Sequence, residues 1–219
     1  MTAPKSPLSR RTGLWPLVHA ERAALAADLA DLTEEQWTTP SLCEGLTVRE
    51  VLAHLTAGAR LNGVRWLAGV IRCRFDFDKQ VAMRLAEQLG TSPADTLDRF
   101  RQVITSTTKP PLPTMAMLGE TIVHGEDIRR PLGIRRAHPI ETLTLVAGYY
   151  SRSDMVVVAK GRIRGLHLVA NDGPFSTGSG PLVTGSTLAL TMAMTGRAAY
   201  CGELDEPGVT TLRDRCGTP

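Results

Sequence analysis

The segment at residues 114–130, TMAMLGETIVHGEDIRR, combines the pattern of a buried helix with several ionisable side chains. This combination constrains the fold more than any other feature of the chain. An α-helix turns by about 100° per residue, so Glu120, His124 and Asp127 lie within about 60° of one another. Apolar residues such as Met117 share that side of the helix. Because burying an unpaired carboxylate is costly, we expect this helix to bring its charged groups to a cation, a metal ion or a hydrogen-bond donor.

Start signals predict further helices on both sides of this segment. Capping boxes occur at residues 33–36 (TEEQ) and 47–50 (TVRE), and Ser92 precedes Pro93, which suits an N-cap followed by the first helical position. The apolar spacing and these caps predict helices at 14–31, 33–36, 47–66, from 92 onward, at 114–130 and at 139–151.

The pattern changes in the last third of the chain. Residues 161–170 alternate with period two, and Asn171-Asp172-Gly173 follows them as a hairpin signal. Two further helices are expected at 185–196 and 206–215. The predicted fold class is therefore α+β, mainly α: a four-helix bundle followed by a small α/β domain. We expect residues 1–12 to be a disordered lead-in, 13–152 the bundle and 153–219 the α/β domain.

Composition excludes several classes of protein. A net charge of +3 is too small to argue for nucleic acid, and no run of apolar residues is long enough for a membrane span. The N-terminus has no apolar core typical of a secretory signal, so we expect a cytoplasmic protein. Arginine outnumbers lysine 21 to 4, which suggests a GC-rich bacterial genome. The oligomeric state is left open between monomer and homodimer.

The four cysteines are expected to be free thiols, because none forms a pair with zinc-site spacing and no export signal precedes them. Cys73 lies between two arginines, which could make it reactive or leave it an ordinary thiol. The role of Cys43 is left open. The cysteines are Cys43, Cys73, Cys201 and Cys216.

A metal site is one interpretation of the ionisable helix face. Glu120 and His124 lie one turn apart, which suits a single metal ion. In the helix that begins near residue 47, His54 falls on the same side as Val51 and Leu61 and therefore faces inward. A lone inward histidine is usually a core residue with a hydrogen-bonded neighbour, and this alternative stays open. The remaining histidines, His19, His138 and His167, are expected to be structural or solvated.

The stretches PSLCEGLTVREVLAHL (40–55) and GETIVHGEDIRRPLG (119–133) resemble the DinB-like superfamily, specifically the mycothiol-dependent maleylpyruvate isomerase family. The resemblance extends to LHLVANDGPFSTGSGPLVTGSTLALTMAMTGR in the last third. It implies a DinB-like four-helix bundle with a C-terminal α/β domain. It also implies that His54, Glu120 and His124 bind a divalent metal, most often zinc. Leu46 stands where the family commonly has tryptophan, so the maleylpyruvate substrate does not follow.

By this resemblance the protein is a metal-dependent enzyme that activates mycothiol, or a related low-molecular-weight thiol, for addition to an electrophilic small molecule. Isomerisation results if the thiol then leaves, and S-transfer results if it stays. The alternative is a metal-containing binding protein without turnover. A third hypothesis is binding of nucleic acid through a cluster of arginines, namely Arg129, Arg130, Arg135 and Arg136. We favour instead a solvated helix end, where the helix dipole stabilises cations.

Two further residues are candidates for the reaction itself. Asp127 could orient a ligand imidazole or bind the metal's water, or it could instead form a salt bridge to Arg129 or Arg130. The resemblance implies an arginine from the second domain that holds an anionic substrate, and Arg197 is the best match.

Overall fold

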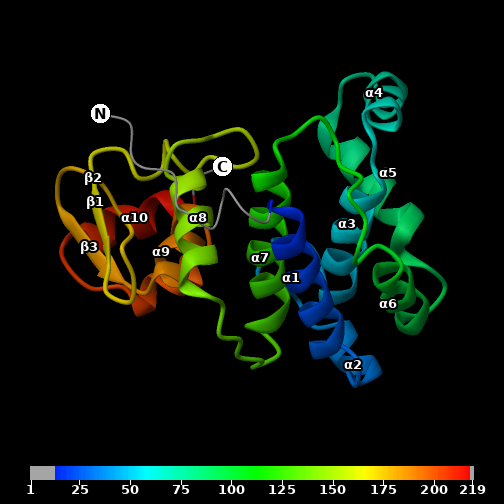
Figure 1. Ribbon diagram of the computed structural model, residues 1–219, viewed down its shortest axis with the longest axis horizontal. Helices are drawn as coiled ribbons and strands as arrows, with labels where there is room; N and C mark the ends of the chain where they lie inside the picture. Colours follow the sequence, from blue (N-terminus) through cyan, green and yellow to red (C-terminus); the bar gives the residue numbers. More distant parts are fainter. Residues whose placement is uncertain (1–12, 218–219) are drawn as a thin grey trace. The chain divides into compact units, whose positions relative to one another are not determined.

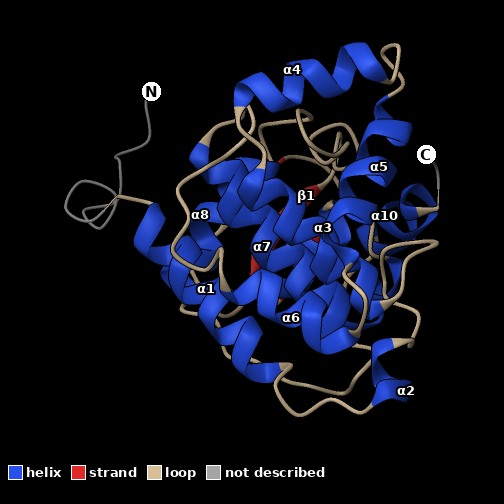
Figure 2. Cartoon of the chain, turned by 90° about the vertical axis from the view of Figure 1, so that its right-hand side faces the viewer, coloured by secondary structure: helices blue, strands red, loops and turns tan. Residues whose placement is uncertain are grey.

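The computed structural model describes residues 13–217, in two compact units that adjoin in sequence at Arg135 and Arg136. The first unit is built from helices, and the second combines helices with a three-stranded sheet (Figures 1 and 2). The fold is therefore mainly helical with a small sheet, as the sequence predicts. The expected lead-in at residues 1–12 lies outside the described residues.

Four helices of the first unit form a bundle. Helix α7 packs against α1 and α3, and α6 packs against the same two helices, while α5 covers α3 from outside (Figure 1). The helices of this unit are α1 (Trp15–Asp28), α2 (Glu34–Trp37), α3 (Val48–Arg60), α4 (Gly63–Arg72), α5 (Phe77–Leu89), α6 (Pro93–Arg101) and α7 (Thr114–Arg129).

One apolar cluster joins the four bundle helices. Leu25 from α1, Leu52 from α3, Phe100 from α6 and Ile128 from α7 all belong to it, and none of these side chains is exposed. Burial of each such side chain contributes about 1.5–3 kcal/mol. This cluster therefore stabilises the end of the bundle at which α1 and α7 end and α3 begins.

The expected helix starts are confirmed. The Thr33 and Thr47 side chains accept the backbone N–H groups of Gln36 and Glu50, whose side chains accept the N–H groups of the two threonines in return. Ser92 caps α6, with proline in its first turn. These starts could be predicted because a capping box uses only residues within one turn of each other.

Two helix predictions in this unit are corrected. The helix expected at 47–66 ends at Arg60, because Leu61 is extended and the Asn62 side chain accepts the N–H of Arg65 to start α4. Helix α5 was missed altogether. Its signal was Asp76, which caps the helix by accepting the N–H of Lys79.

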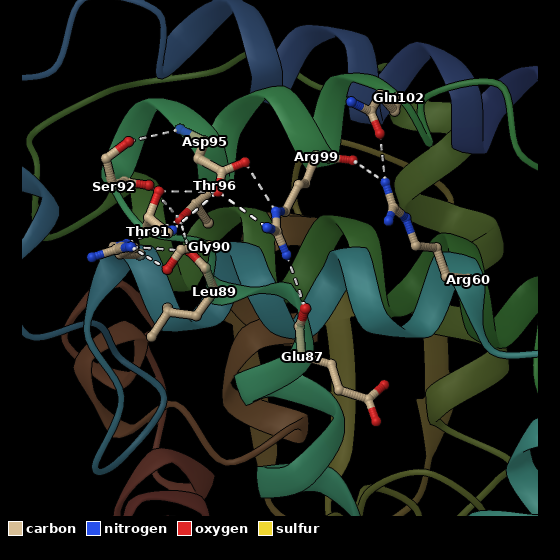
Figure 3. Close-up of polar contacts among 11 residues, drawn as sticks. Arg60, Glu87, Leu89, Gly90, Thr91, Ser92, Asp95, Thr96, Arg99 and Gln102 are labelled. Carbon is tan, nitrogen blue, oxygen red and sulfur yellow. Dashed lines mark hydrogen bonds and ion pairs between the residues drawn. The ribbon is translucent and has the colours of Figure 1, made fainter.

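A polar network fastens α6 to α5 (Figure 3). Arg99 Nε and Nη2 donate to the two carboxylate oxygens of Asp95 at 3.0 and 3.1 Å, and Nη1 donates to the Glu87 carbonyl at 3.0 Å. Arg60 of α3 reaches the Gln102 side chain at 2.8 Å. The polar face of α6 is therefore tied to both α5 and α3.

A buried ion pair ties α7 to α1. Arg129 is 1% exposed, and its Nε donates to Asp28 Oδ2 at 2.8 Å. Its Nη1 lies 3.4 Å from Glu126 Oε1. The guanidinium fits because Gly125 has no side chain, since a Cβ there would lie 2.8 Å from Nη1. Placing Arg129 in a solvated helix end was therefore wrong.

The second unit contains a sheet with the strand order β2-β1-β3. Strand β1 pairs antiparallel with β2 and parallel with β3, and α9 packs on β1 and β3. The hairpin expected at residues 171–173 joins β1 to β2. The elements are α8 (Ile140–Tyr150), β1 (His167–Ala170), β2 (Ser176–Gly178), β3 (Leu182–Gly185), α9 (Thr187–Met194), the 3-10 helix η2 (Ala198–Glu203) and α10 (Gly208–Cys216).

Two sequence boundaries differ from the structure. The strand expected at 161–170 begins only at His167, because the preceding residues form turns and Gly165 has a positive φ of 74°. The two compact units divide at 135/136, whereas the sequence prediction places the domain boundary at 152/153. Helix α8 packs against α9 and so belongs to the second unit, a long-range contact that no local pattern reports.

The four cysteines are free, as expected. Among residues 13–217, no helix has the length and apolar character that crossing a bilayer requires.

We predict that Arg129→Gln lowers the free energy of unfolding by about 3 kcal/mol, because Asp28 and Glu126 lose the buried cation between them. Urea denaturation followed by circular dichroism measures the change. The control is Arg101→Gln, which breaks the exposed pair with Asp98 and should cost less than about 1 kcal/mol. Equal losses of unfolding free energy in the two variants would show that the buried ion pairs of Arg129 contribute no more to stability than an exposed pair.

Candidate metal centre

Two neighbouring helices carry the predicted metal ligands. Glu120 and His124 lie on successive turns of α7, and His54 lies on α3, which packs against α7. The structure brings the three side chains together: one donor atom from each lies within 4.8 Å of the other two. The inward orientation deduced from helical periodicity is therefore confirmed for all three.

The donor distances are suited to one shared ion. Glu120 Oε2 lies 3.4 Å from His124 Nε2 and 3.7 Å from His54 Nε2. The two imidazoles meet edge to face, with ring centroids 4.9 Å apart. Ligands bonded at 2.0–2.2 Å to a tetrahedral zinc ion are themselves about 3.3–3.5 Å apart. The three donors therefore fit a zinc-like ion, although they are too far apart for strong hydrogen bonds to one another.

Asp127 fixes the orientation of His124. Its Oδ2 lies 2.9 Å from His124 Nδ1, and its side chain is fully buried. A carboxylate can only accept, so Nδ1 donates the proton and Nε2 is left facing Glu120. The geometry supports orientation of the imidazole, and Arg129, one of the two arginines considered as partners of Asp127, binds Asp28 and Glu126 instead. A carboxylate behind a histidine is the usual support of a metal ligand.

The charges in the cluster shift each other's pKa. Burial opposes protonation of His124, but the Glu120 carboxylate and the hydrogen bonds with Asp127 and Cys43 raise its pKa well above the ordinary value. Burial also opposes ionisation of Glu120, yet the positive charge of His124 and the two imidazoles lower its pKa below the usual range. Without a metal, the cluster is therefore an ion pair between Glu120 and His124.

Cys43 is a functional candidate that the sequence left without a role. Its Sγ lies within 4.8 Å of donor atoms of both His124 and Asp127, which makes a second group of potential ligands. The backbone N–H of Leu42 donates to the Asp127 carbonyl at 3.1 Å, which holds this loop against α7. The signal available was its position in the Cys-Glu-Gly stretch just before α3. His124 belongs to both groups, so a metal ion bound by one group would use the histidine that the other group also requires.

Arg60 of α3, a cation that could in principle pair with Glu120, is engaged elsewhere. Arg60 donates to Gln102 and to the Arg99 carbonyl. The carboxylate of Glu120 instead faces His54 and His124. An ordinary ion pair between Glu120 and Arg60 is therefore not formed.

The remaining sequence candidates are not part of this group of donors. His19 stacks on Trp15, and His167 Nε2 lies 3.3 Å from Ser176 Oγ. Neither these histidines nor His138 join a group of three metal-capable donors within residues 13–217. Arg197 lies in the second unit, just before η2, where its Nη1 donates to the Thr195 carbonyl at 2.7 Å. Its contact with an anionic substrate stays a prediction.

Comparison with known proteins supports the resemblance read from the sequence. Residues 18–110 match the model of the mycothiol maleylpyruvate isomerase N-terminal domain, a range that contains His54 and ends before Glu120. No curated protein sequence matches significantly.

Two solved structures share the fold across both units. A crystal structure of a histidine-to-alanine mutant of the mycothiol-dependent maleylpyruvate isomerase is 13% identical, with a TM-score of 0.64, covering 92% of this chain and 93% of that one. A second crystal structure of the mycothiol-dependent maleylpyruvate isomerase is 11% identical, with a TM-score of 0.56 and the same coverage. The expected likeness is confirmed at the level of the fold.

We predict that Glu120→Gln destabilises the metal-free protein in a pH-dependent way. The raised pKa of His124 stabilises the fold fully below its unfolded pKa, about 6.5, and this contribution is lost as pH rises through the folded pKa. The lowered pKa of Glu120 stabilises the fold at pH values above the unfolded pKa of about 4.3, and this contribution is lost as pH falls through the folded pKa. The difference between wild type and variant should therefore be largest near pH 5–6, on the order of 1 kcal/mol.

Urea unfolding of chelator-treated protein from pH 5 to 9 measures this difference. The difference in unfolding free energy should decrease as pH rises, because a neutral His124 is no longer attracted to the Glu120 carboxylate. A difference that is constant with pH would contradict the ion pair.

Proposed function

We propose that His54, Glu120 and His124 hold one divalent metal ion, most suitably zinc, and that the protein uses it to activate a low-molecular-weight thiol. The thiol, mycothiol or a relative of it, would add to an electrophilic small molecule, either as an isomerase or as an S-transferase. The proposal rests chiefly on the convergence of two imidazoles and one carboxylate from α3 and α7 at 3.4 and 3.7 Å.

The chemistry of the donor set supports a catalytic rather than a structural ion. Three protein ligands leave one coordination position for another molecule, whereas structural zinc sites use four protein ligands. The side chains of His54 and Glu120 are 27% and 23% exposed, so a molecule from solvent can approach them. A metal ion bound by these residues would supply a Lewis acid that favours the thiolate form of a bound thiol.

Asp127 and Glu120 have different roles in this proposed site. Asp127 holds His124 Nδ1 and thereby keeps Nε2 directed at the ligand position. Glu120 contributes the one negative charge, so that two neutral histidines and a divalent cation leave a net charge of about +1. That charge suits a single thiolate in a partly buried site. The fold shared with the mycothiol-dependent maleylpyruvate isomerase supports mycothiol as the thiol.

We predict that the purified protein contains about one zinc per chain and that His54→Ala, His124→Ala and Glu120→Gln lose it, because each removes one of three ligands. Elemental analysis after growth in zinc-replete medium measures the content. His167→Ala, a histidine outside the cluster, is the matched control and should keep the metal. Cys43→Ser should keep it too, since Cys43 belongs only to the competing group.

Two outcomes would contradict this assignment. Retention of zinc by Glu120→Gln would remove Glu120 from the site. Loss of zinc in Cys43→Ser, with retention in His54→Ala, would transfer the metal to the group formed by Cys43, His124 and Asp127.

We also predict metal- and mycothiol-dependent consumption of activated alkenes or other electrophiles by the wild-type protein. His54→Ala should reduce the rate by at least about 100-fold, because the thiol then reacts only with its solution fraction of thiolate. Product analysis by mass spectrometry separates isomerisation, which regenerates the thiol, from S-transfer, which retains it. Zinc-loaded protein that binds mycothiol without any thiol-dependent reaction would instead establish the binding-protein alternative.

A further inference from the structure

Arg22 is a buried cation on α1 whose burial the bundle does not explain. It is 3% exposed, and its Nη1 donates to the carbonyls of Val103 and Ser106 at 3.1 and 2.9 Å. These two bonds hold the guanidinium against the turn that follows α6. They use only the two N–H groups of Nη1 and leave those of Nε and Nη2 for another partner.

No carboxylate of residues 13–217 forms an ion pair with Arg22, in contrast to Arg129 of α7, which has two. Burial lowers the pKa of Arg22 to about 10, so the side chain is still protonated at neutral pH. A buried cation without an anion is unfavourable. The position therefore favours a negative charge in direct contact with Nε and Nη2, which no residue in the described range 13–217 provides.

The unpaired guanidinium and the metal ligands share one cavity. Arg22, His54 and Glu120 line a small pocket of about 30 Å³ that is partly open to solvent, and its walls include Met117 and Gly58. This volume holds about two water-sized groups, enough for the two oxygens of a carboxylate. Gly58 lies one turn after His54 and so on the same face of α3, and a Cβ there would meet no atom within 4 Å.

We propose that Arg22 is a specificity-determining residue that binds a carboxylate of the electrophilic substrate beside the His54–Glu120–His124 cluster. The assignment to the substrate of a reaction rests on the proposed function, whereas the carboxylate site itself does not. Planar guanidinium suits a planar carboxylate, which can accept from Nε and Nη2 together. With a metal bound, the cluster and Arg22 carry a total of about +2, so the cavity favours an anion over a neutral molecule.

This arginine is distinct from Arg197. Arg22 belongs to the bundle and lies in the same cavity as two of the metal ligands, whereas Arg197 is in the second unit. The apolar wall at Met117 favours a short carbon chain next to the carboxylate.

The test uses propionate and its neutral isostere propionamide as probes, titrated into chelator-treated protein and followed by NMR. Absence of metal ensures that any preference for the acid comes from the chain itself. We expect wild type to bind propionate at least about tenfold more tightly than propionamide, and Arg22→Gln to lose that preference. Arg22→Lys should retain part of it, because the charge remains.

Two further variants keep the test decisive if Arg22→Gln folds poorly. Gly58→Val keeps Arg22 but fills the space beside His54, and should abolish propionate binding in a folded protein. Arg49→Gln is the matched control: Arg49 also caps backbone carbonyls, those of Leu89 and Gly90, but does not line the cavity. It should keep propionate binding. Equal affinity for acid and amide in wild type, or unchanged binding in Gly58→Val, would overturn the proposal.

The outcome is separable from that of the proposed function. If the protein prefers propionate in an Arg22-dependent way but has no zinc and no thiol-dependent turnover, the carboxylate site is supported and the proposed reaction is contradicted. Thiol-dependent turnover in which Arg22→Gln leaves the KM ratio of a substrate acid to its methyl ester unchanged would remove the role of Arg22 and keep the reaction.

Discussion

Helix α7 is buried along almost its whole length and nevertheless carries Glu120, His124, Asp127 and Arg129. In a medium of low dielectric constant, each of these charges requires a partner within a few ångströms. Arg129 is paired with Asp28 of α1, Asp127 with His124, and Glu120 faces imidazoles from α7 and α3. Burial of apolar surface has no preferred direction, whereas each charge pair requires one particular neighbour within a few ångströms. Pairing on α7 therefore specifies the arrangement of the bundle as well as its chemistry.

The same pairing gives different tasks to groups of similar chemistry. Asp127 is fully buried behind the Nδ1 of His124, and Glu120 is partly exposed in front of its Nε2. One carboxylate thus orients the imidazole and the other is available as a ligand. The arginines also differ in role: Arg129 pairs with two carboxylates and is structural, whereas Arg22 pairs with none among residues 13–217 and lines a pocket with His54 and Glu120, two of the proposed metal ligands. With a metal ion bound as proposed, the helical unit would present both the ion and the guanidinium to the same small molecule.

Much of the fold could be predicted because its signals are local. The capping boxes at Thr33 and Thr47 require only residues within one turn, and the structure contains both. The break after Arg60 and the whole of α5 were missed, although Asn62 and Asp76 carried the signals as caps. The division of the two units at 135/136 could not be predicted, for a different reason. Residues 139–151 form the expected helix, but whether it joins the bundle or the sheet depends on distant packing partners.

By itself, the sequence determined which side chains face inward. The 3.6-residue period placed Glu120, His124 and Asp127 on one side of α7 and turned His54 toward the core of α3, because the direction of a side chain on a helix follows from its position alone. The tertiary structure decided which groups meet. The loop that carries Cys43, the turn that orients Arg22 and the choice of His124 as the partner of Asp127 all depend on how separate segments pack. Periodicity contains no information about distances between helices, and the reach of a hydrogen bond or a metal bond is only a few ångströms.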